Sequence, residues 1–461
     1  MFKLDFKKPI HVHFIGIGGI SMSGLAQILL KEGFTISGSD RLESEMTKKL
    51  TSYGATIFLE HKKENITKDI DLIVYTAAIH EDNEEMQEAN RLGIPLMTRA
   101  CLLGQMMTNY KTPIAVSGTH GKTTTTSMIS EVLMAADLDP TITVGGILPS
   151  IQGNLRIGTS PVFITEACEY TNSFLDFFPQ ISVILNVEED HMDFFHNLEE
   201  IQDSFHRFAK KLPDDGLLII NKDMESFDPI IKDLSCRIKT FGLSNGCDYQ
   251  ATNISYDELG NGHYDLLIDG NFAFPVALHV PGEHNVLNSL SAIAVAFELG
   301  ITVEHIKQGL LAFGGTKRRF EYKGERNGVT IIDDYAHHPT EITATLHSAK
   351  HYPHKELWCV FQPHTYTRTK AFLADFAKAL HHADHIVLLD IYAAREKDTG
   401  EVSSKDILNL LLNEYQANAI HMPSFDEAET YLINHCKEGD LIITMGAGDV
   451  VKVGEHLLEN K

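Results

Sequence analysis

One segment of the chain contains the residue types that bind nucleotide phosphates: Gly118, Thr119, His120, Gly121, Lys122, Thr123 and Thr124. In a loop of this type the backbone amides surround the phosphates, the lysine ammonium contacts the β- and γ-oxygens, and the hydroxyl after it binds Mg²⁺. A consensus loop has its first glycine at position 116, where Val116 stands, so the segment is a shortened variant. It lies between an expected strand at 113–117 and an expected helix at 124–136, which favours nucleotide binding over a chance turn.

Acidic residues and a histidine follow the next two expected strands. Glu166 ends the run at 162–166, and His191 follows the run at 182–187. Ligands of open α/β sheets bind outside the carboxyl ends of the strands, so we expect both side chains to face the Lys122 loop. A magnesium ion held by Thr123 needs further oxygen or nitrogen ligands, and Glu166 and His191 are the candidates. Taken one at a time, the neighbouring carboxylates of Glu188, Glu189 and Asp193 are expected to be exposed to solvent.

A second glycine turn stands near the start of the chain, with the pattern Gly16-x-Gly18-Gly19-x-Ser21. It follows an apolar run and opens a helix, whose N-terminal amides and dipole suit a phosphate. Asp40 ends the next apolar run, where a carboxylate can accept a hydrogen bond from a ribose hydroxyl. The alternative is a tight strand-to-helix turn beside a solvated aspartate, but the pattern favours phosphate binding.

The last third of the chain repeats polar clusters at or just after its expected strand ends. They comprise Lys317–Phe320, Asp333–Glu341, Gln362–His364, Arg368, Asp390–Tyr392, Arg395–Glu396 and Gly446–Asp449. His337 beside Asp333 and Asp334 is the histidine we single out among 24. Upstream, His284-Asn285-x-x-Asn288 opens a helix, and its amides either cap that helix or reach a nucleotide base; the spacing leaves both possibilities open.

Length and composition limit the class of protein. At roughly 150 residues per domain, 461 residues predict about three domains. The net charge of −24 repels phosphate backbones and anionic lipid, which argues against nucleic acid or a membrane as partner. The six cysteines form no C-x-x-C pair, so a reducing cytoplasm is expected. The uncharged stretch 9–30 is too polar and too rich in glycine for a signal peptide or a membrane span.

Alternating apolar runs and amphipathic segments predict an α/β protein of three domains. The first, 1–110, reads as a Rossmann-like parallel sheet, and the second, 111–315, as an α/β ATPase domain with a phosphate loop. Within the second, the short alternating segments at 237–281 predict inserted antiparallel strands. Gly314-Gly315 marks a linker, and 316–461 reads as a Rossmann-like third domain.

Taken in order, these motifs resemble the Mur ligase family over essentially the whole chain, and within it the group that adds L-alanine. The matching segments are 16–26, 118–124, 190–193, 284–288, 318–320, 333–341 and 390–396. The resemblance implies an ATP-dependent enzyme of peptidoglycan precursor synthesis. It would join L-alanine to the carboxylate of UDP-N-acetylmuramate through an acyl phosphate, with Mg²⁺, or Mn²⁺ as the alternative, as metal. A cytoplasmic monomer or weak homodimer is expected.

The resemblance also implies roles for individual residues. Lys122, His191, Arg319 and His337 would be catalytic, with His337 as the base, and Thr123, Glu166 and His191 would hold metal. ATP would contact Gly118–Thr124, Asn288, Arg319 and Asp334. The UDP-substrate would contact Gly16, Gly18, Gly19, Ile20, Ser21, Asp40 and Thr76. The closing third domain would present His337, His364, Arg368, Tyr392 and Arg395 to the amino acid.

Two positions depart from the family pattern, and three other functions compete. Ser21 stands where glycine is usual, and Thr365 where arginine is frequent, which points to Arg368 as the basic residue that meets the anionic substrate.

An NAD-dependent dehydrogenase would explain the first glycine turn but not the Lys122 loop. A nucleotide-switched interaction protein would explain Lys122 but not the histidine and aspartate motifs. Within the family, the ligase that recycles the murein tripeptide is the nearest rival.

Overall fold

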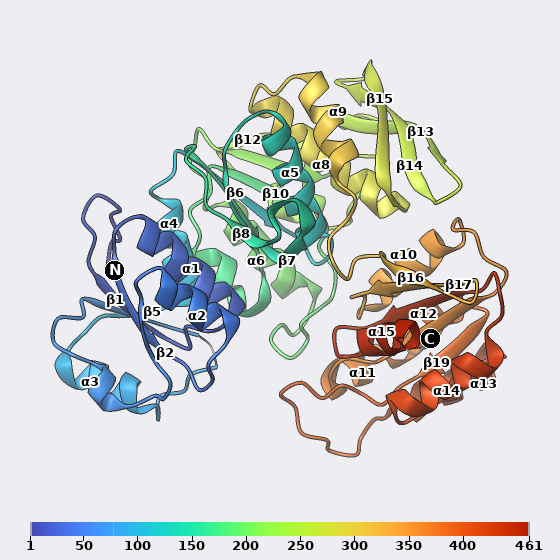
Figure 1. Cartoon of the computed structure of the whole chain (residues 1–461). Coiled ribbons are helices and arrows are strands. Elements are labelled where there is room, and N and C mark those ends of the chain that lie inside the picture. Colours follow the sequence, from blue (N-terminus) through green and yellow to red (C-terminus); the bar gives the residue numbers. More distant parts are fainter. Residues whose placement is uncertain (1, 77, 460–461) are drawn as a thin grey trace.

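Three separate β-sheets organise the computed structural model, which describes residues 2–76 and 78–459. Figure 1 shows them as three bodies along the chain: the first at the left, the central one at the top and the third at the lower right. We call them the first, central and third units. The expectation of three α/β units is confirmed, whereas the boundaries after residues 110 and 315 stay predictions.

The first unit has a parallel sheet in the order β3-β2-β1-β4-β5. Its strands are β1 (His11–Ile15), β2 (Thr35–Ser39), β3 (Thr56–Phe58), β4 (Leu72–Tyr75) and β5 (Leu96–Thr98). Its helices are α1 (Ile20–Lys31), α2 (Glu45–Ser52), α3 (Glu84–Leu92) and α4 (Arg99–Met107). The strand order reverses between β1 and β4, which is where sheets of this kind bind ligands. The short strand β3 has too few residues to show in the apolar pattern, and we did not predict it.

The central sheet has the order β15-β14-β13-β12-β11-β10-β6-β9-β7-β8. Its strands are β6 (Thr112–Ser117), β7 (Thr141–Leu148), β8 (Gly153–Arg156), β9 (Val162–Ala167), β10 (Ile181–Ile184), β11 (Leu217–Asn221), β12 (Arg237–Gly242), β13 (Tyr249–Tyr256), β14 (Asn261–Ile268) and β15 (Asn271–Pro281). Its helices are α5 (Lys122–Ala135), α6 (Leu198–Ala209), α7 (Phe227–Ile231), α8 (Glu283–Glu298) and α9 (Val303–Ala312). Strand β6 lies between β10 and β9 and is parallel to both, so the motifs that follow these three strands meet at one edge.

The prediction of antiparallel strands throughout 237–281 is wrong at its start. Strand β12 pairs in parallel with β11, and β13 pairs in parallel with β12. Only β13, β14 and β15 form an antiparallel set. Helix α7 connects β11 to β12 as a crossover, which returns the chain in the same direction. An alternating pattern indicates a strand but not the direction of its neighbour.

The third sheet has the order β16-β17-β21-β18-β19-β20, with only the β16–β17 pair antiparallel. Its strands are β16 (Glu321–Arg326), β17 (Val329–Asp334), β18 (Leu357–Phe361), β19 (His385–Leu388), β20 (Ala419–His421) and β21 (Leu441–Met445). Its helices are α10 (Pro339–Ala349), α11 (Tyr366–Ala371), α12 (Leu373–Leu380), α13 (Ser404–Glu414), α14 (Phe425–His435) and α15 (Val451–Glu459). The single helix expected at 370–381 is the pair α11 and α12. Strand β16 was not predicted, because it is largely polar at the sheet edge.

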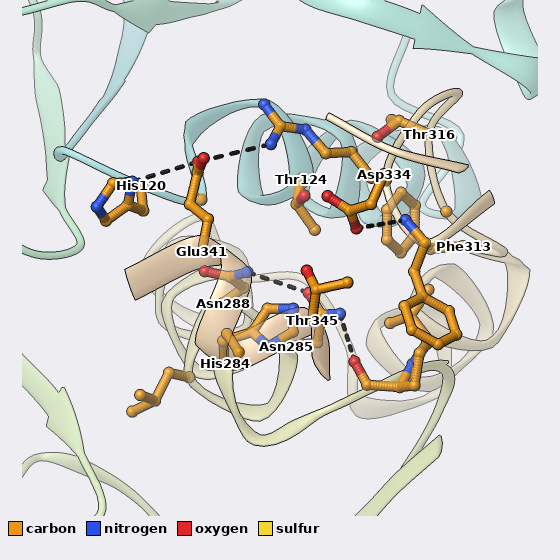
Figure 2. Close-up of a pocket in the computed structure, with 18 of the residues that line it drawn as sticks. His120, Thr124, His284, Asn285, Asn288, Phe313, Thr316, Asp334, Glu341 and Thr345 are labelled. Atoms are coloured by element: carbon orange, nitrogen blue, oxygen red, sulfur yellow. Dashed lines mark hydrogen bonds and ion pairs between the residues drawn. The ribbon is translucent and has the colours of Figure 1, made fainter. Parts of the chain in front are cut away.

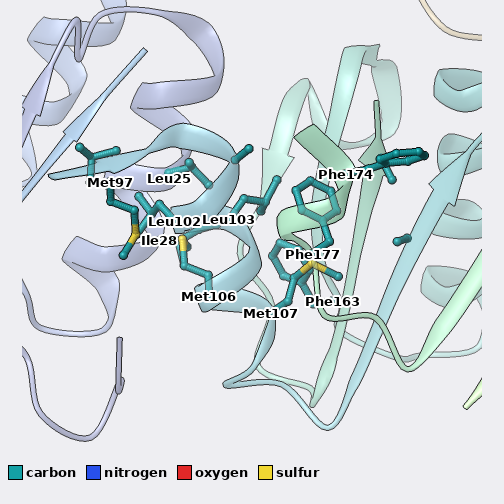
Figure 3. Close-up of a cluster of buried hydrophobic side chains, with 14 of the residues drawn as sticks. Leu25, Ile28, Met97, Leu102, Leu103, Met106, Met107, Phe163, Phe174 and Phe177 are labelled. Carbon is teal, nitrogen blue, oxygen red and sulfur yellow. The ribbon is translucent and has the colours of Figure 1, made fainter. Parts of the chain in front are cut away.

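The first and central units share one continuous apolar core, shown in Figure 3. Leu102, Leu103, Met106 and Met107 of α4 pack between the helices of the first sheet and the phenylalanines at positions 163, 174 and 177. At Gly104 an added Cβ would lie 2.0 Å from the carbonyl oxygen of Asp176, so the backbones approach too closely for any side chain. The third unit has apolar clusters of its own. The first unit is therefore fixed to the central one by core packing, whereas the third meets it through polar contacts.

Two further observations concern the whole described chain. All six cysteines are free thiols, as their spacing predicts. None of the helices in residues 2–76 and 78–459 is long and apolar enough to cross a membrane.

Candidate active site

The Lys122 loop connects β6 to α5 and has a backbone that requires glycine. Gly118 and Gly121 have φ angles of 144° and 83°. A Cβ at Gly121 would lie 2.7 Å from the side-chain oxygen of Asn288, so the loop passes against α8 with no room for a side chain. The amide of His120 donates to Oδ1 of Asn186 at 2.7 Å, which ties the loop to the end of β10. The loop therefore has a fixed backbone shape at the N-terminus of α5, the kind of position where a phosphate binds.

Lys122 forms an ion pair with a carboxylate that the sequence analysis assigned no role. Its Nζ lies 3.0 Å from Oε2 of Glu169, whose side chain is almost fully buried, and it also donates to the carbonyl of Thr119 at 3.0 Å. Burial alone would lower the pKa of Lys122, but the charge of Glu169 raises it above the ordinary lysine value. Lys122 therefore stays charged. Glu169 stands three residues after Glu166, and that spacing past β9 was the available signal.

The predicted metal ligands Thr123 and Glu166 are brought together. The hydroxyl of Thr123 donates to Oε2 of Glu166 at 3.1 Å, and the amide of Gly145 donates to the other carboxylate oxygen. A hydroxyl and a carboxylate at this distance are oxygen ligands of the kind Mg²⁺ takes, so the donor set fits that ion. Among the described residues no basic side chain forms an ion pair with Glu166, so its negative charge is available to a cation.

His191 lies next to Glu169, the carboxylate that pairs with Lys122. Its Nε2 is 3.6 Å from Oε1 of Glu169, and its ring lies 4.6 Å from that of Tyr170. Burial lowers the pKa of His191 below the ordinary histidine value, with Asp190 and Glu169 opposing the change. The imidazole is therefore neutral near pH 7 and has a nitrogen lone pair, as a metal ligand needs.

A cavity of about 920 Å³ opens beside the loop, between the central and third units. Figure 2 shows ten of its lining residues: His120, Thr124, His284, Asn285, Asn288, Phe313, Thr316, Asp334, Glu341 and Thr345. Its apolar and amide groups suit a nucleoside. Asn285 donates to the carbonyl of Pro281 at 2.7 Å and accepts from Asn288 at 3.1 Å. Helix α8 has no side-chain cap, so the capping alternative for these asparagines is wrong.

Arg319 and Asp334 reach the cavity from the third unit. Asp334 accepts backbone amides of Phe320 at 2.8 Å and Ala336 at 2.7 Å, and burial raises its pKa to about 6. The guanidinium of Arg319 lies 5.2 Å from the ring centre of Tyr335 and 3.7 Å from Glu341. The third unit thus supplies a cation and an anion to a cavity whose opposite wall is the phosphate loop.

His337 does not pair with Asp333 or Asp334, the two aspartates that precede it in the sequence. Asp333 instead accepts from Arg318 at 3.0 Å and from Thr444 at 2.7 Å. Alternate residues of a strand face opposite sides of the sheet, which turns Asp333 away. The partner of His337 is Glu341, one helical turn on, at 3.2 Å from Nδ1. A carboxylate at this distance orients the imidazole.

The remaining residues predicted to meet the amino acid lie in the loop before α11, on α11 itself and in the loop after β19. Arg368 donates to Asp190 of the central unit at 2.8 Å and contacts His364 at 3.2 Å. The hydroxyl of Thr365 caps α11, the helix that carries Arg368, which gives this unusual residue a local role. Tyr392 forms a parallel bridge with His364, with ring centres 5.8 Å apart. Arg395 is exposed further along the same loop.

The first glycine turn lies at the switch point of the first sheet. Gly16, with a φ of 83°, faces Thr76 after β4, and a Cβ there would lie 2.9 Å from the Thr76 methyl. Asp40 accepts the amide of Gly18 at 2.8 Å, so its carboxylate stabilises the turn itself. Gly19 precedes α1, and Ile20 opens the helix with 66% of its surface exposed.

Arg99, the first residue of α4, is a cation that the sequence analysis missed. Its guanidinium donates to the hydroxyl of Ser21 at 3.0 Å. Burial lowers its pKa, and among the described residues no carboxylate forms an ion pair with it. A half-buried, unpaired guanidinium beside a helix N-terminus is suited to bind an anion. No local motif marks Arg99, because the contact joins residues 78 positions apart.

Comparison with known proteins gives matches over all three units. Family models described as "Mur ligase family, catalytic domain", "Mur ligase middle domain" and "Mur ligase, glutamate ligase domain" match residues 11–111, 116–296 and 318–448. The chain is 56% identical to a UDP-N-acetylmuramate–L-alanine ligase of Lachnospira eligens, with 100% of each chain covered. It is 57% identical to the enzyme of that name from Agathobacter rectalis, again over 100% of each chain.

Solved structures agree with the sequence matches. The crystal structure of UDP-N-acetylmuramate-alanine ligase MurC from Thermotoga maritima superimposes with a TM-score of 0.79 at 30% identity, covering 98% of this chain and 99% of that one. A murein peptide ligase from Psychrobacter arcticus gives a TM-score of 0.70 at 28% identity, covering 98% of each chain. A dehydrogenase or a nucleotide-switched interaction protein is excluded by full-length similarity to ligases. The chain belongs to the Mur ligase family.

Proposed function

We propose that the chain joins L-alanine to the carboxylate of UDP-N-acetylmuramate and converts ATP to ADP and phosphate. The observation that carries this proposal is the full-length identity of 56–57% to two ligases of that name. The similarity to a murein peptide ligase is lower, at 28%. The site is compatible with this chemistry, because a phosphate loop, a nucleoside-sized cavity and a distant anion site lie on three connected units.

ATP occupies the cavity between the central and third units. Its phosphates extend into the loop, where Lys122 contacts them and Glu169 keeps that lysine charged and fixed. Asn288, Arg319 and Asp334 line the cavity where the nucleoside lies. The residues that contact ATP are Gly118–Thr124, Asn288, Arg319 and Asp334.

Thr123, Glu166 and His191 are the residues that hold metal, with Mg²⁺ as the fitting ion. An ion held there would supply positive charge close to the transferring phosphoryl group. Thr123 and Glu166 would supply oxygen ligands, and His191, next to the Glu169 partner of Lys122, would supply a nitrogen ligand.

The UDP end of the other substrate binds at the first glycine turn. Its residues are Gly16, Gly18, Gly19, Ile20, Ser21, Asp40 and Thr76. The turn itself contains no basic residue, and the Asp40 carboxylate at Gly18 adds negative charge. Arg99 supplies the missing cation from α4 and, oriented by Ser21, contacts the diphosphate. The apolar packing of α4 against the central unit then fixes the distance between the diphosphate and Lys122.

The amino acid binds against the third unit, at His337, His364, Arg368, Tyr392 and Arg395. The pair between Arg368 and Asp190 places this group of residues next to His191. His337 takes a proton from the incoming ammonium, and the nearby Glu341 stabilises the imidazolium that results.

The reaction proceeds in two stages. An oxygen of the muramate carboxylate attacks the γ-phosphorus of ATP, the bond to the β,γ-bridging oxygen breaks, and ADP leaves with that oxygen. The alanine amine then attacks the acyl carbon, and the phosphate departs with the oxygen that came from the carboxylate. Lys122 neutralises charge on the phosphoryl group in the first stage. The reaction has no membrane step, and we propose that it takes place in the cytoplasm.

Mass spectrometry of products tests this proposal. The protein is incubated with ATP, Mg²⁺, UDP-N-acetylmuramate and an equimolar mixture of amino acids and murein tripeptide. We expect UDP-N-acetylmuramoyl-L-alanine as the main product. A main product that carries the tripeptide contradicts the assignment. With oxygen-18 in the muramate carboxylate, the label must appear in the released phosphate; ligation without this transfer contradicts the acyl phosphate.

A further inference from the structure

Three potential metal ligands meet where the third unit touches the central one. His120 of the phosphate loop, Glu188 after β10 and His338 before α10 each offer one ligand atom, and these atoms lie within 4.8 Å of one another. Nε2 of His120 is 3.7 Å from Oε2 of Glu188, and the two imidazole centres are 4.7 Å apart. None of the three belongs to the magnesium ligands proposed above.

His120 is oriented as a metal-binding histidine is. Its Nδ1 lies 3.2 Å from Oε1 of Glu341, whereas its buried Nε2 has no hydrogen-bond partner among the described residues. Metal-ligating histidines characteristically donate their other ring N–H to a carboxylate or a backbone carbonyl. Glu341 therefore occupies the position of the outer carboxylate, and the unpartnered nitrogen is directed at Glu188.

His338 shows the same arrangement with a carbonyl. Its Nε2 lies 3.1 Å from the carbonyl oxygen of Glu189, so this nitrogen carries the hydrogen. The other nitrogen, Nδ1, accepts the amide of Thr340 at 3.3 Å, a long hydrogen bond that a bound metal ion would replace. Nδ1 is therefore the nitrogen through which His338 would bind a metal ion.

We propose that His120, Glu188 and His338 form a binding site for a transition-metal ion of the zinc class, which fastens the third unit to the phosphate loop. Two imidazoles and one carboxylate are a ligand set that proteins use for Zn²⁺, with a fourth position open. Ligands of a tetrahedral ion at about 2.1 Å lie roughly 3.4 Å apart, close to the separation between His120 and Glu188. Mg²⁺ prefers oxygen ligands, so it competes weakly at a site where two of the three ligands are nitrogens.

The site couples metal binding to the contact between the two units. His120 and Glu188 belong to the central unit and His338 to the third, so the full ligand set exists only while the units touch. A metal ion that binds the full ligand set stabilises the arrangement in which the central and third units touch. Binding also displaces any proton on His120, because a coordinating nitrogen must be deprotonated.

Cobalt titration of the full-length protein tests the proposal, because tetrahedral Co²⁺ absorbs visible light far more strongly than octahedral Co²⁺. The titration is done without nucleotide and with excess Mg²⁺, and Zn²⁺ is then added as competitor. His338→Asn retains a hydrogen-bond acceptor at the helix cap, and Glu188→Gln retains one for Thr340. Both are expected to weaken Co²⁺ binding at least tenfold. His347→Asn, on the same helix but outside the cluster, is the matched control and is expected to bind as the wild type does.

Two results would overturn the proposal. One is equal Co²⁺ affinity in the wild type and both ligand variants, with circular dichroism and thermal unfolding showing that all are folded. The other is loss of the tetrahedral spectrum in His191→Ala but not in the two ligand variants, which would place the ion at the magnesium ligands. Because each ligand variant removes a different ligand, one folded variant is sufficient to decide.

Discussion

The chain contains two glycine turns that each join a parallel strand to the N-terminus of a helix, and they obtain their positive charge in different ways. The turn before α5 ends in its own lysine, Lys122, which Glu169 holds by an ion pair. The turn before α1 has no cation of its own, and the Arg99 guanidinium reaches it from α4. Both can bind a phosphate, but only one of them is recognisable as charged from its local sequence.

The difference follows from what each phosphate group must do. During transfer of a phosphoryl group the distribution of its negative charge changes, and positive groups must lie close enough to neutralise that charge. The lysine and the metal ligands therefore lie together at the Lys122 loop. A diphosphate that only anchors a substrate needs a fixed contact, and a guanidinium held by a hydroxyl provides it. The anchoring cation lies on α4, the helix whose apolar face joins the two units. Substrate position and the packing between units therefore depend on the same helix.

The largest effect is expected for a substitution that changes the function of one glycine turn and leaves that of the other intact. Lys122→Ala should reduce ATP turnover by roughly 10²–10³-fold, because the phosphoryl group loses its main cation. Binding of UDP-N-acetylmuramate, measured by titration calorimetry, should be nearly unchanged, since it occurs at the other turn. Lys111→Ala, an exposed lysine before β6, is the control. A folded Lys122→Ala protein that loses both ligands equally would contradict the division of roles.

The reciprocal change is Arg99→Met. A lost hydrogen bond between charged groups should weaken binding of UDP-N-acetylmuramate roughly 10- to 100-fold, with ATP binding retained. Arg91→Met, whose exposed guanidinium pairs with Glu88, should leave both affinities unchanged. If calorimetry finds the same UDP-N-acetylmuramate affinity in Arg99→Met as in the wild type, the cation of the first turn must come from elsewhere.

His191→Ala distinguishes a metal-assisted site from a simple phosphate cradle. Loss of this ligand should raise the Mg²⁺ concentration needed for half-maximal activity by roughly tenfold. Folding should be intact, since His191 lies at the rim of the sheet. His196→Ala, five residues on and with its side chain 86% exposed, is the matched control. An unchanged Mg²⁺ profile would assign His191 a purely structural role.

The smallest effect tests how Arg99 is held. Ser21→Ala removes one neutral hydrogen-bond partner, so the affinity for UDP-N-acetylmuramate should fall only about two- to fivefold. In an Arg99→Met background the same substitution should have no further effect, because the hydroxyl acts through the guanidinium. Additive losses in this double-mutant cycle would mean that Ser21 contacts the substrate directly.

The parts of the site that lie within one motif could be predicted from the sequence. The loop between β6 and α5 was placed correctly, and so were Glu166 near the end of β9 and His191 after β10, because the parallel strands on either side of β6 bring their carboxyl ends to one edge. The role of Glu169 was missed although it lies three residues from Glu166. The pairing of His337 with Glu341 was not predicted, although the two residues lie one helical turn apart.

The sequence by itself determined most of the longer secondary elements, the division into three α/β units and the phosphate loop, since these depend on periodicity and local turn chemistry. Only the tertiary structure decided the direction of β12, the reach of Arg99 to Ser21, and the meeting of His120, Glu188 and His338. Each of these depends on how separate elements pack. A contact between residues far apart in the chain leaves no local pattern, because its energy comes from burial and charge that exist only once the units have assembled.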